Sequence, residues 1–151
     1  KALVAYGFIQ AAGAGIGQVC FGPLCARFGR KRTFAWMHVL SFLMVPVVCY
    51  APQSYWHLLV LLPVFGFFSL SIHSGYAIYF PELFPNHLRA TGASFCFNAG
   101  RLLAAPMLWL SGVMKQSMGL PSAMTILAGF FLLGLLVLCF LPETKDKPLP
   151  D

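Results

Sequence analysis

Five apolar runs, each close to the length of a membrane-spanning helix, constrain this chain more than any other feature of its sequence. They extend over about residues 2–25, 33–50, 55–80, 90–114 and 121–141. A helix needs about 20 apolar residues to cross the hydrocarbon of a bilayer, where only helices and closed barrels satisfy their backbone hydrogen bonds. The runs therefore predict an all-α membrane protein with five transmembrane helices.

The composition also indicates lipid as the main solvent. Only 9% of the 151 residues are charged and 59% are hydrophobic, whereas a soluble domain carries about a quarter charged residues. Ten bases and four acids are too few to coat an apolar core of this size. Because the bases lie in the gaps between apolar runs and not over one face, the net charge of +6 indicates membrane topology and not a nucleic-acid partner.

The distribution of Lys and Arg predicts the orientation, since cytoplasmic loops retain positive charge. Alternate gaps hold Arg27, Arg30, Lys31, Arg32, Arg89, Lys145 and Lys147, whereas the other side holds Lys1 and Lys115. We therefore expect the N-terminus outside, the C-terminus in the cytoplasm, and segments 27–32, 81–89 and 142–151 on one face. An odd number of spans that begins outside without a leader peptide also leads us to expect at least one helix upstream.

Three motifs fall in the segments expected to be cytoplasmic. They are GPLCARFGRKR at 22–32, PELFPNHLRATG at 81–92 and PETK at 142–145. The bases of the first motif can bind acids or helix C-termini, although an ordinary positive loop explains this motif better when it is taken alone. The second motif places Glu82 and Arg89 at another turn on the same side. The three together make a cytoplasmic charge network the stronger interpretation.

In this order the motifs resemble those of the C-terminal half of a major facilitator superfamily transporter, from the eighth helix to the twelfth. The first is similar to the family's G-x-x-x-D-R-x-G-R-[RK] loop, the second to the loop after helix ten, and the third to the tail of sugar porters. The resemblance covers residues 1–151 and implies part of a six-helix bundle in the plasma or inner membrane. It also implies a missing N-terminal half as partner, and alternating access as mechanism.

Two departures from the family pattern modify these expectations. The acid of the first motif is replaced by Ala26, so Arg27 and Arg30 need another partner. Glu82 and Glu143 are the candidates, and we predict that one of the two bases pairs with Glu82. The sugar-porter pattern G-P-x-x-W-x-x-x-E would place Gly, Pro and Trp where the chain has Ser74, Gly75 and Ile78, so an aromatic platform for a sugar is missing. The predicted cytoplasmic network consists of Arg27, Arg30, Lys31, Glu82, Arg89 and Glu143.

Arg101 is the main candidate for substrate binding. The stretch RATGASFCFNAGRLLAAP resembles relatives that carry aromatic acids, sialate and other organic anions with protons, and it places Arg101 about 13 Å inside the membrane. A charge at this depth costs about 2.5 kcal/mol or more, so it normally faces a cavity or a partner. Asn98, His73 and Gln10 complete the candidate set. A purely structural interpretation stays open for all four. Arg101 would then snorkel or bind helix carbonyls and the amide of Asn98, and His73 would be a hydrogen-bonded packing residue.

We therefore expect secondary active transport of a small organic anion together with a proton. A sugar or polyol porter and a structural membrane protein without a transport cycle are the alternatives. An enzyme is not expected, because all four acids lie outside the spans and no HExxH, GxSxG or phosphate-binding glycine loop occurs. The five cysteines lack metal-ligand spacing, and we predict neither a metal nor a cofactor. His38 and His57, near span ends, are interpreted as interfacial residues.

Overall fold

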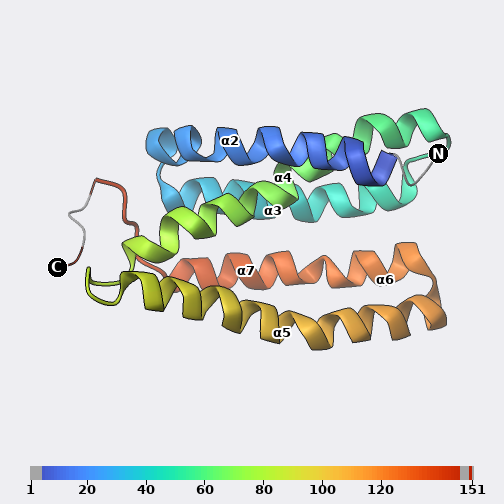
Figure 1. Ribbon diagram of the computed structural model, residues 1–151. Helices are drawn as coiled ribbons and strands as arrows, with labels where there is room; N and C mark the ends of the chain where they lie inside the picture. Colours follow the sequence, from blue (N-terminus) through green and yellow to red (C-terminus); the bar gives the residue numbers. More distant parts are fainter. Residues whose placement is uncertain (1–4, 147–149, 151) are drawn as a thin grey trace.

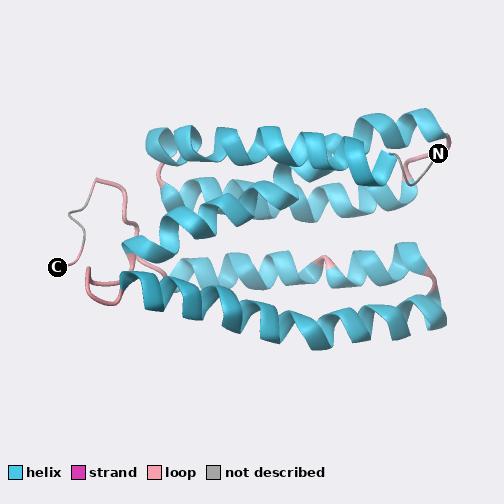
Figure 2. Cartoon of the chain, viewed as in Figure 1, coloured by secondary structure: helices cyan, strands magenta, loops and turns pink. Residues whose placement is uncertain are grey.

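The computed structural model describes residues 5–146 and residue 150, and this part of the chain is helical with short connections (Figure 1, Figure 2). The elements in order are the π-helical turn η1 (Ala5–Ile9), α2 (Gln10–Phe28), α3 (Arg30–Tyr50), α4 (Tyr55–Glu82), α5 (Arg89–Met118), α6 (Leu120–Leu127) and α7 (Gly129–Phe140). No strand occurs among the described residues. The predicted all-α class is confirmed.

The last expected span is formed by two helices, α6 and α7. Ala128 separates them but keeps helical dihedral angles, with φ −59° and ψ −22°. Its carbonyl accepts a hydrogen bond from the N–H of Phe131 at 2.9 Å, three residues on, so the turn tightens locally. The two helices continue in one direction, and Figure 2 shows the short break between them.

Within the described residues, four helical stretches are long and apolar enough to cross a membrane. They are Gly7–Phe28, Arg30–Tyr50, Tyr55–Glu82 and Leu120–Phe140. The remaining helix, α5, has 30 residues and is long enough, but its composition is less apolar than that of the other four. With α6 and α7 counted as one, the described residues form five long helical stretches, as predicted, and length and composition together identify four of them as spans.

The closest helix contact is between α2 and α4, and glycines make it possible. A Cβ on Gly13 would lie 2.0 Å from the carbonyl oxygen of Pro63, and a Cβ on Gly17 would lie 2.5 Å from that of Phe67. Gly66 of α4 approaches Gln10 in the same way. Small residues four apart let helix backbones approach closely in lipid, where apolar burial alone gives little drive for association.

The core lies where α2, α3, α4 and α7 meet. Phe21 and Phe34 form an edge-to-face pair with ring centroids 5.2 Å apart, a favourable geometry for aromatic rings. A Cβ on Gly75 would come within 2.4 to 2.5 Å of these two rings. The aromatic core therefore requires a small residue at position 75, where the chain departs from the sugar-porter pattern.

The long helix α5 lies at the edge of this arrangement, beside α6 and α7 in Figure 1. None of its residues, all of which the structure describes, is buried. It contacts α4 in its first half, where the rings of Phe97 and Phe80 pack edge to face with centroids 5.6 Å apart. Large apolar side chains such as Leu102 and Trp109 remain more than 70% exposed. The described chain therefore leaves most of the surface of α5 uncovered.

Candidate functional site

The polar turns converge at one end of the bundle. The α2–α3 turn, the α4–α5 turn and the segment after α7 lie together there (Figure 1). The predicted common face is confirmed for 27–32, 81–89 and 142–146, whereas residues 147–149 and 151 lie outside the described residues. The assignment of this end to the cytoplasm stays a prediction.

The centre of this end is a fork-shaped ion pair between Arg30 and Glu82. Nη2 of Arg30 lies 2.7 Å from Oε1 of Glu82, and Nε lies 3.2 Å from Oε2. The side chains are only 20% and 15% exposed. The hydroxyl of Thr144 also donates to Oε2, at 2.5 Å. The predicted pair is present, and of the two candidate bases it uses Arg30, whose paired donors match a carboxylate.

The second acid, Glu143, binds backbone rather than a base. Its carboxylate accepts hydrogen bonds from the N–H groups of Arg30 at 2.9 Å and Lys31 at 3.1 Å, and from those of Thr144 and Lys145 at 3.1 Å. Helix α3 has no capping side chain of its own, so a residue far along the chain satisfies its first N–H groups. Partial burial alone would raise the pKa of Glu143, but these backbone donors outweigh it and hold the pKa below its ordinary value.

Gly29 makes this arrangement possible. It ends α2 with a φ of +95°, a conformation that side chains rarely adopt. A Cβ at this position would also lie 3.1 Å from Oε2 of Glu143. The glycine therefore sets the sharp α2–α3 turn and leaves room for the carboxylate that caps α3.

The lysines of this end bind helix C-termini. Nζ of Lys31 donates to the carbonyl of Cys139 in the last turn of α7, at 3.2 Å. Nζ of Lys145 donates to the carbonyl of Arg27 at the end of α2, at 2.9 Å. Both interactions place positive charge where the helix dipole is negative. Together with a hydrogen bond from the hydroxyl of Tyr79 to the carbonyl of Pro142, they fix the segment after α7.

Two members of the predicted network lie outside it. The Arg27 guanidinium sits over the ring of Phe28, 5.5 Å from its centroid, and among the described residues it has no polar partner. Arg89 donates to Oδ1 of Asn86 and to the carbonyl of Pro150, both at 3.4 Å. The structure thus brings together Arg30, Lys31, Glu82 and Glu143. Thr144 and Tyr79, which sequence reasoning missed, belong to the same cluster.

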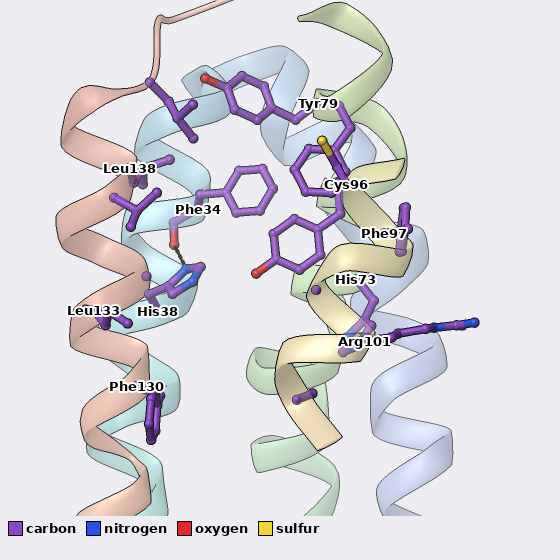
Figure 3. A pocket seen from close by; sticks show the side chains of 17 residues that line it. Phe34, His38, His73, Tyr79, Cys96, Phe97, Arg101, Phe130, Leu133 and Leu138 are labelled. Atoms are coloured by element: carbon purple, nitrogen blue, oxygen red, sulfur yellow. Dashed lines mark hydrogen bonds between the residues drawn. The ribbon is translucent and has the colours of Figure 1, made fainter. Parts of the chain in front are cut away.

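Arg101 lines two cavities between the helices. A larger one of about 570 Å³ is bounded by α3, α4, α5 and α7, and a smaller one of about 380 Å³ lies between α4 and α5. In Figure 3 the guanidinium points away from the aromatic side chains of the larger cavity. Within the described residues it forms no hydrogen bond or ion pair. Its predicted role in substrate binding stays a prediction.

The other three candidates occupy different environments. Asn98 lines the smaller cavity with Arg101, but its amide donates to the carbonyl of Ser94 at 2.9 Å and not to the guanidinium. His73 is exposed and lines the larger cavity, with its ring 6.2 Å from that of Tyr76. Gln10 is 8% exposed and is wedged against Gly66 of α4. Three of the four candidates therefore line cavities, whereas Gln10 lies in a helix contact.

The interpretation of His38 as interfacial was wrong. Its side chain is 6% exposed and lines the larger cavity (Figure 3). Nδ1 lies 2.8 Å from the carbonyl oxygen of Phe34, one turn earlier, and so carries the proton that this oxygen accepts. The ring rests against α7, where a Cβ on Gly134 would lie 2.7 Å from Nε2. Buried positions 33, 34, 37, 38, 41 and 45 share one helical face, and this periodicity was the signal for a buried histidine.

Comparison with known proteins decides the family. The family model described as Major Facilitator Superfamily matches residues 2–151, almost the whole chain. The chain belongs to the Major Facilitator Superfamily. The resemblance inferred from the motifs is thereby confirmed, and the apolar helices are those of a multi-pass membrane protein.

Curated members of this superfamily resemble the chain at low identity. A probable 4-methylmuconolactone transporter of Cupriavidus pinatubonensis is 26% identical over 91% of this chain and 32% of its own length. A cis,cis-muconate transport protein of Acinetobacter baylyi is 25% identical over 88% and 32%. Human solute carrier family 22 member 11 is 31% identical over 90% of this chain and 25% of its own length. The chain therefore spans about a third or less of these relatives.

Proposed function

We propose that the intact protein is a secondary transporter of a small organic anion and that Arg101 contributes to the substrate site. The observation that carries this proposal is an arginine within a long helix that lines cavities and has no counter-ion among the described residues. All four acids of the chain lie outside the apolar runs. A buried or membrane-embedded guanidinium needs a compensating charge, and a carboxylate substrate provides one with matching fork geometry.

The relatives support this substrate class. Two of them are named for the transport of muconate or a muconolactone, and muconate is a carboxylate. The family and these names indicate a transporter and not an enzyme. The sugar alternative is weaker because Ser74, Gly75 and Ile78 replace the residues of the sugar-porter pattern.

The mechanism in this proposal is alternating access, in which two halves of the transporter rock about a site near the middle of the bilayer. The Arg30–Glu82 pair and the cap of Glu143 on α3 tie three segments together at one end. These contacts would latch that end in the outward-open state and separate when the protein opens to the cytoplasm. Proton symport would use a carboxylate outside this chain, since its own acids lie beyond the helical spans or at their ends.

Uptake into liposomes tests this function. The full-length protein is reconstituted with an inward proton gradient, and uptake of labelled cis,cis-muconate is compared with uptake of labelled glucose. We expect muconate uptake that collapses with a protonophore, and at least a tenfold loss in Arg101→Gln with a partial loss in Arg101→Lys. Lys115→Gln, which removes a base from the other end of α5, is the matched control. Uptake of glucose but not muconate, or full activity of Arg101→Gln, would contradict the proposal.

A further inference from the structure

Helix α3 carries an exposed stripe along one side. Its exposed residues are Arg32, Trp36, Leu43, Val47 and Tyr50. Their spacings of four, seven, four and three residues place them on one helical face. The opposite face, which includes Phe34, Met37 and Val45, is buried in the bundle. The described chain therefore leaves most of one side of this candidate membrane span exposed, with half-buried Val39 and Leu40 in the middle of the stripe.

The order of residues in this stripe matches the layers of a bilayer. Arg32 is followed one turn later by Trp36, which is 66% exposed, and the stripe ends at Tyr50, which is 60% exposed. The distance along the axis from Arg32 to Tyr50 is about 27 Å at the rise of an α-helix, close to the hydrocarbon thickness of about 30 Å. Trp and Tyr are typical of the two membrane interfaces, with apolar residues between them. This order favours lipid as the occupant of the stripe, with Arg32 at the level of the headgroups.

The charge at Arg32 is free to bind a ligand. The other bases near it are already engaged, since Arg30 pairs with Glu82 and Lys31 binds the end of α7. The neighbouring acid Glu143 is occupied by backbone N–H groups. In contrast, the exposed Arg32 forms no hydrogen bond or ion pair within the described part of the chain. The exposed guanidinium of Arg27 at the end of α2, which has no polar partner among the same residues, adds positive charge across the turn.

We propose that Arg32 and Trp36 form a binding site for an anionic phospholipid at this end of α3. The guanidinium binds the phosphate and the adjacent anionic headgroup, and Trp36 one turn deeper packs along the upper part of an acyl chain. Arg27 increases the local positive potential, as basic residues next to a membrane span do toward anionic lipids. This site is separate from Arg101 and from the proposed transport function, and it requires neither.

Lipid titration of the purified full-length protein tests this site. The protein in neutral detergent is titrated with dioctanoyl phosphatidylserine and, in parallel, with dioctanoyl phosphatidylcholine, and binding is followed by thermophoresis. We expect tighter binding of phosphatidylserine in the wild type. Arg32→Gln should weaken phosphatidylserine binding about fivefold, the effect of one base near an anionic surface, and leave phosphatidylcholine unchanged. Arg32→Lys should retain most of the preference.

Lys115→Gln is the matched control, because it removes one base from the opposite end of the bundle and should leave both titrations unchanged. Trp36→Leu separates a lipid site from a simple anion site, since it should weaken phosphatidylserine binding without changing binding of inorganic phosphate. Equal affinity for the two lipids, or an unchanged phosphatidylserine affinity in Arg32→Gln, would overturn the proposal. The proposal would also be overturned if inorganic phosphate displaced the lipid at equal concentration. The same holds if Trp36→Leu changed the oligomeric mass of the protein and left its lipid binding unchanged.

Discussion

Helices α4 and α5 are consecutive and similar in length, at 28 and 30 residues, yet they are used in opposite ways. Helix α4 buries Gly66, Ile72 and Tyr79 against its neighbours and ends in Glu82, whose charge is paired. Helix α5 buries none of its residues, and its Arg101 is unpaired within the described chain. Within the described chain, α4 is therefore packed into the core, whereas α5 has a largely uncovered surface and an arginine without a partner.

The largest effect should come from a glycine that lets α2 and α4 touch. In Gly66→Ala the new Cβ would lie 2.4 Å from the backbone oxygen of Gln10, and we expect a loss of about 3 kcal/mol of unfolding free energy through overpacking. The matched control is Gly112→Ala on α5, where the Cβ would meet nothing within 4 Å in the described chain. That change should cause no loss, since Ala favours a helix more than Gly does. Reversible unfolding of the full-length protein in mixed micelles measures both, and equal losses would remove the contrast between the helices.

Removing one charged side chain from each of these two helices should give the next largest difference in unfolding free energy. Glu82→Ala leaves Arg30 and Thr144 without their acceptor, and we expect a loss of about 2 kcal/mol because charge-assisted hydrogen bonds are broken. Arg101→Ala should leave stability unchanged or raise it, because an uncompensated charge is removed. The same unfolding assay applies. If Arg101→Ala destabilises the protein as much as Glu82→Ala, Arg101 has a structural partner and the contrast is wrong.

Low pH should reduce the stability contributed by the charged end of the bundle, by a smaller amount. Because the pKa of Glu143 is lowered in the fold, its stabilising contribution is complete above the ordinary value of 4.5 and is lost as pH falls through the lowered value. Glu143→Gln should therefore flatten the decline of the melting temperature between about pH 5 and pH 3. Asp146→Asn, an exposed neighbour, is the control and should keep the wild-type slope. A slope that Glu143→Gln leaves unchanged would show that the cap on α3 contributes nothing to stability.

The five long helices were predictable because each follows from a local apolar run. The convergence of the turns was predictable because their motifs lie in alternate gaps between these runs. The partner of Glu82 was predicted only as Arg27 or Arg30, because the choice depends on the direction of the chain at Gly29 and on helix rotation. The cap formed by Glu143 joins positions 113 residues apart, so no local pattern reveals it. His38 was misplaced because its polarity suggested an interface, whereas Gly134 on α7 leaves room to bury it. Gln10 is likewise buried beside Gly66 of α4, and its role in substrate binding stays a prediction.

The central claim is that α5 presents Arg101 to a carboxylate substrate, and thiol labelling one turn away tests it most directly. Ala104 is exposed and lines the larger cavity together with Arg101. Ala104→Cys in a full-length background without other reactive cysteines should be modified by a charged thiol reagent, and saturating cis,cis-muconate should slow this reaction whereas glucose should not. Adding Arg101→Gln should abolish the protection but leave the labelling. Protection by muconate that persists in Arg101→Gln, or labelling that muconate never slows, would contradict the account.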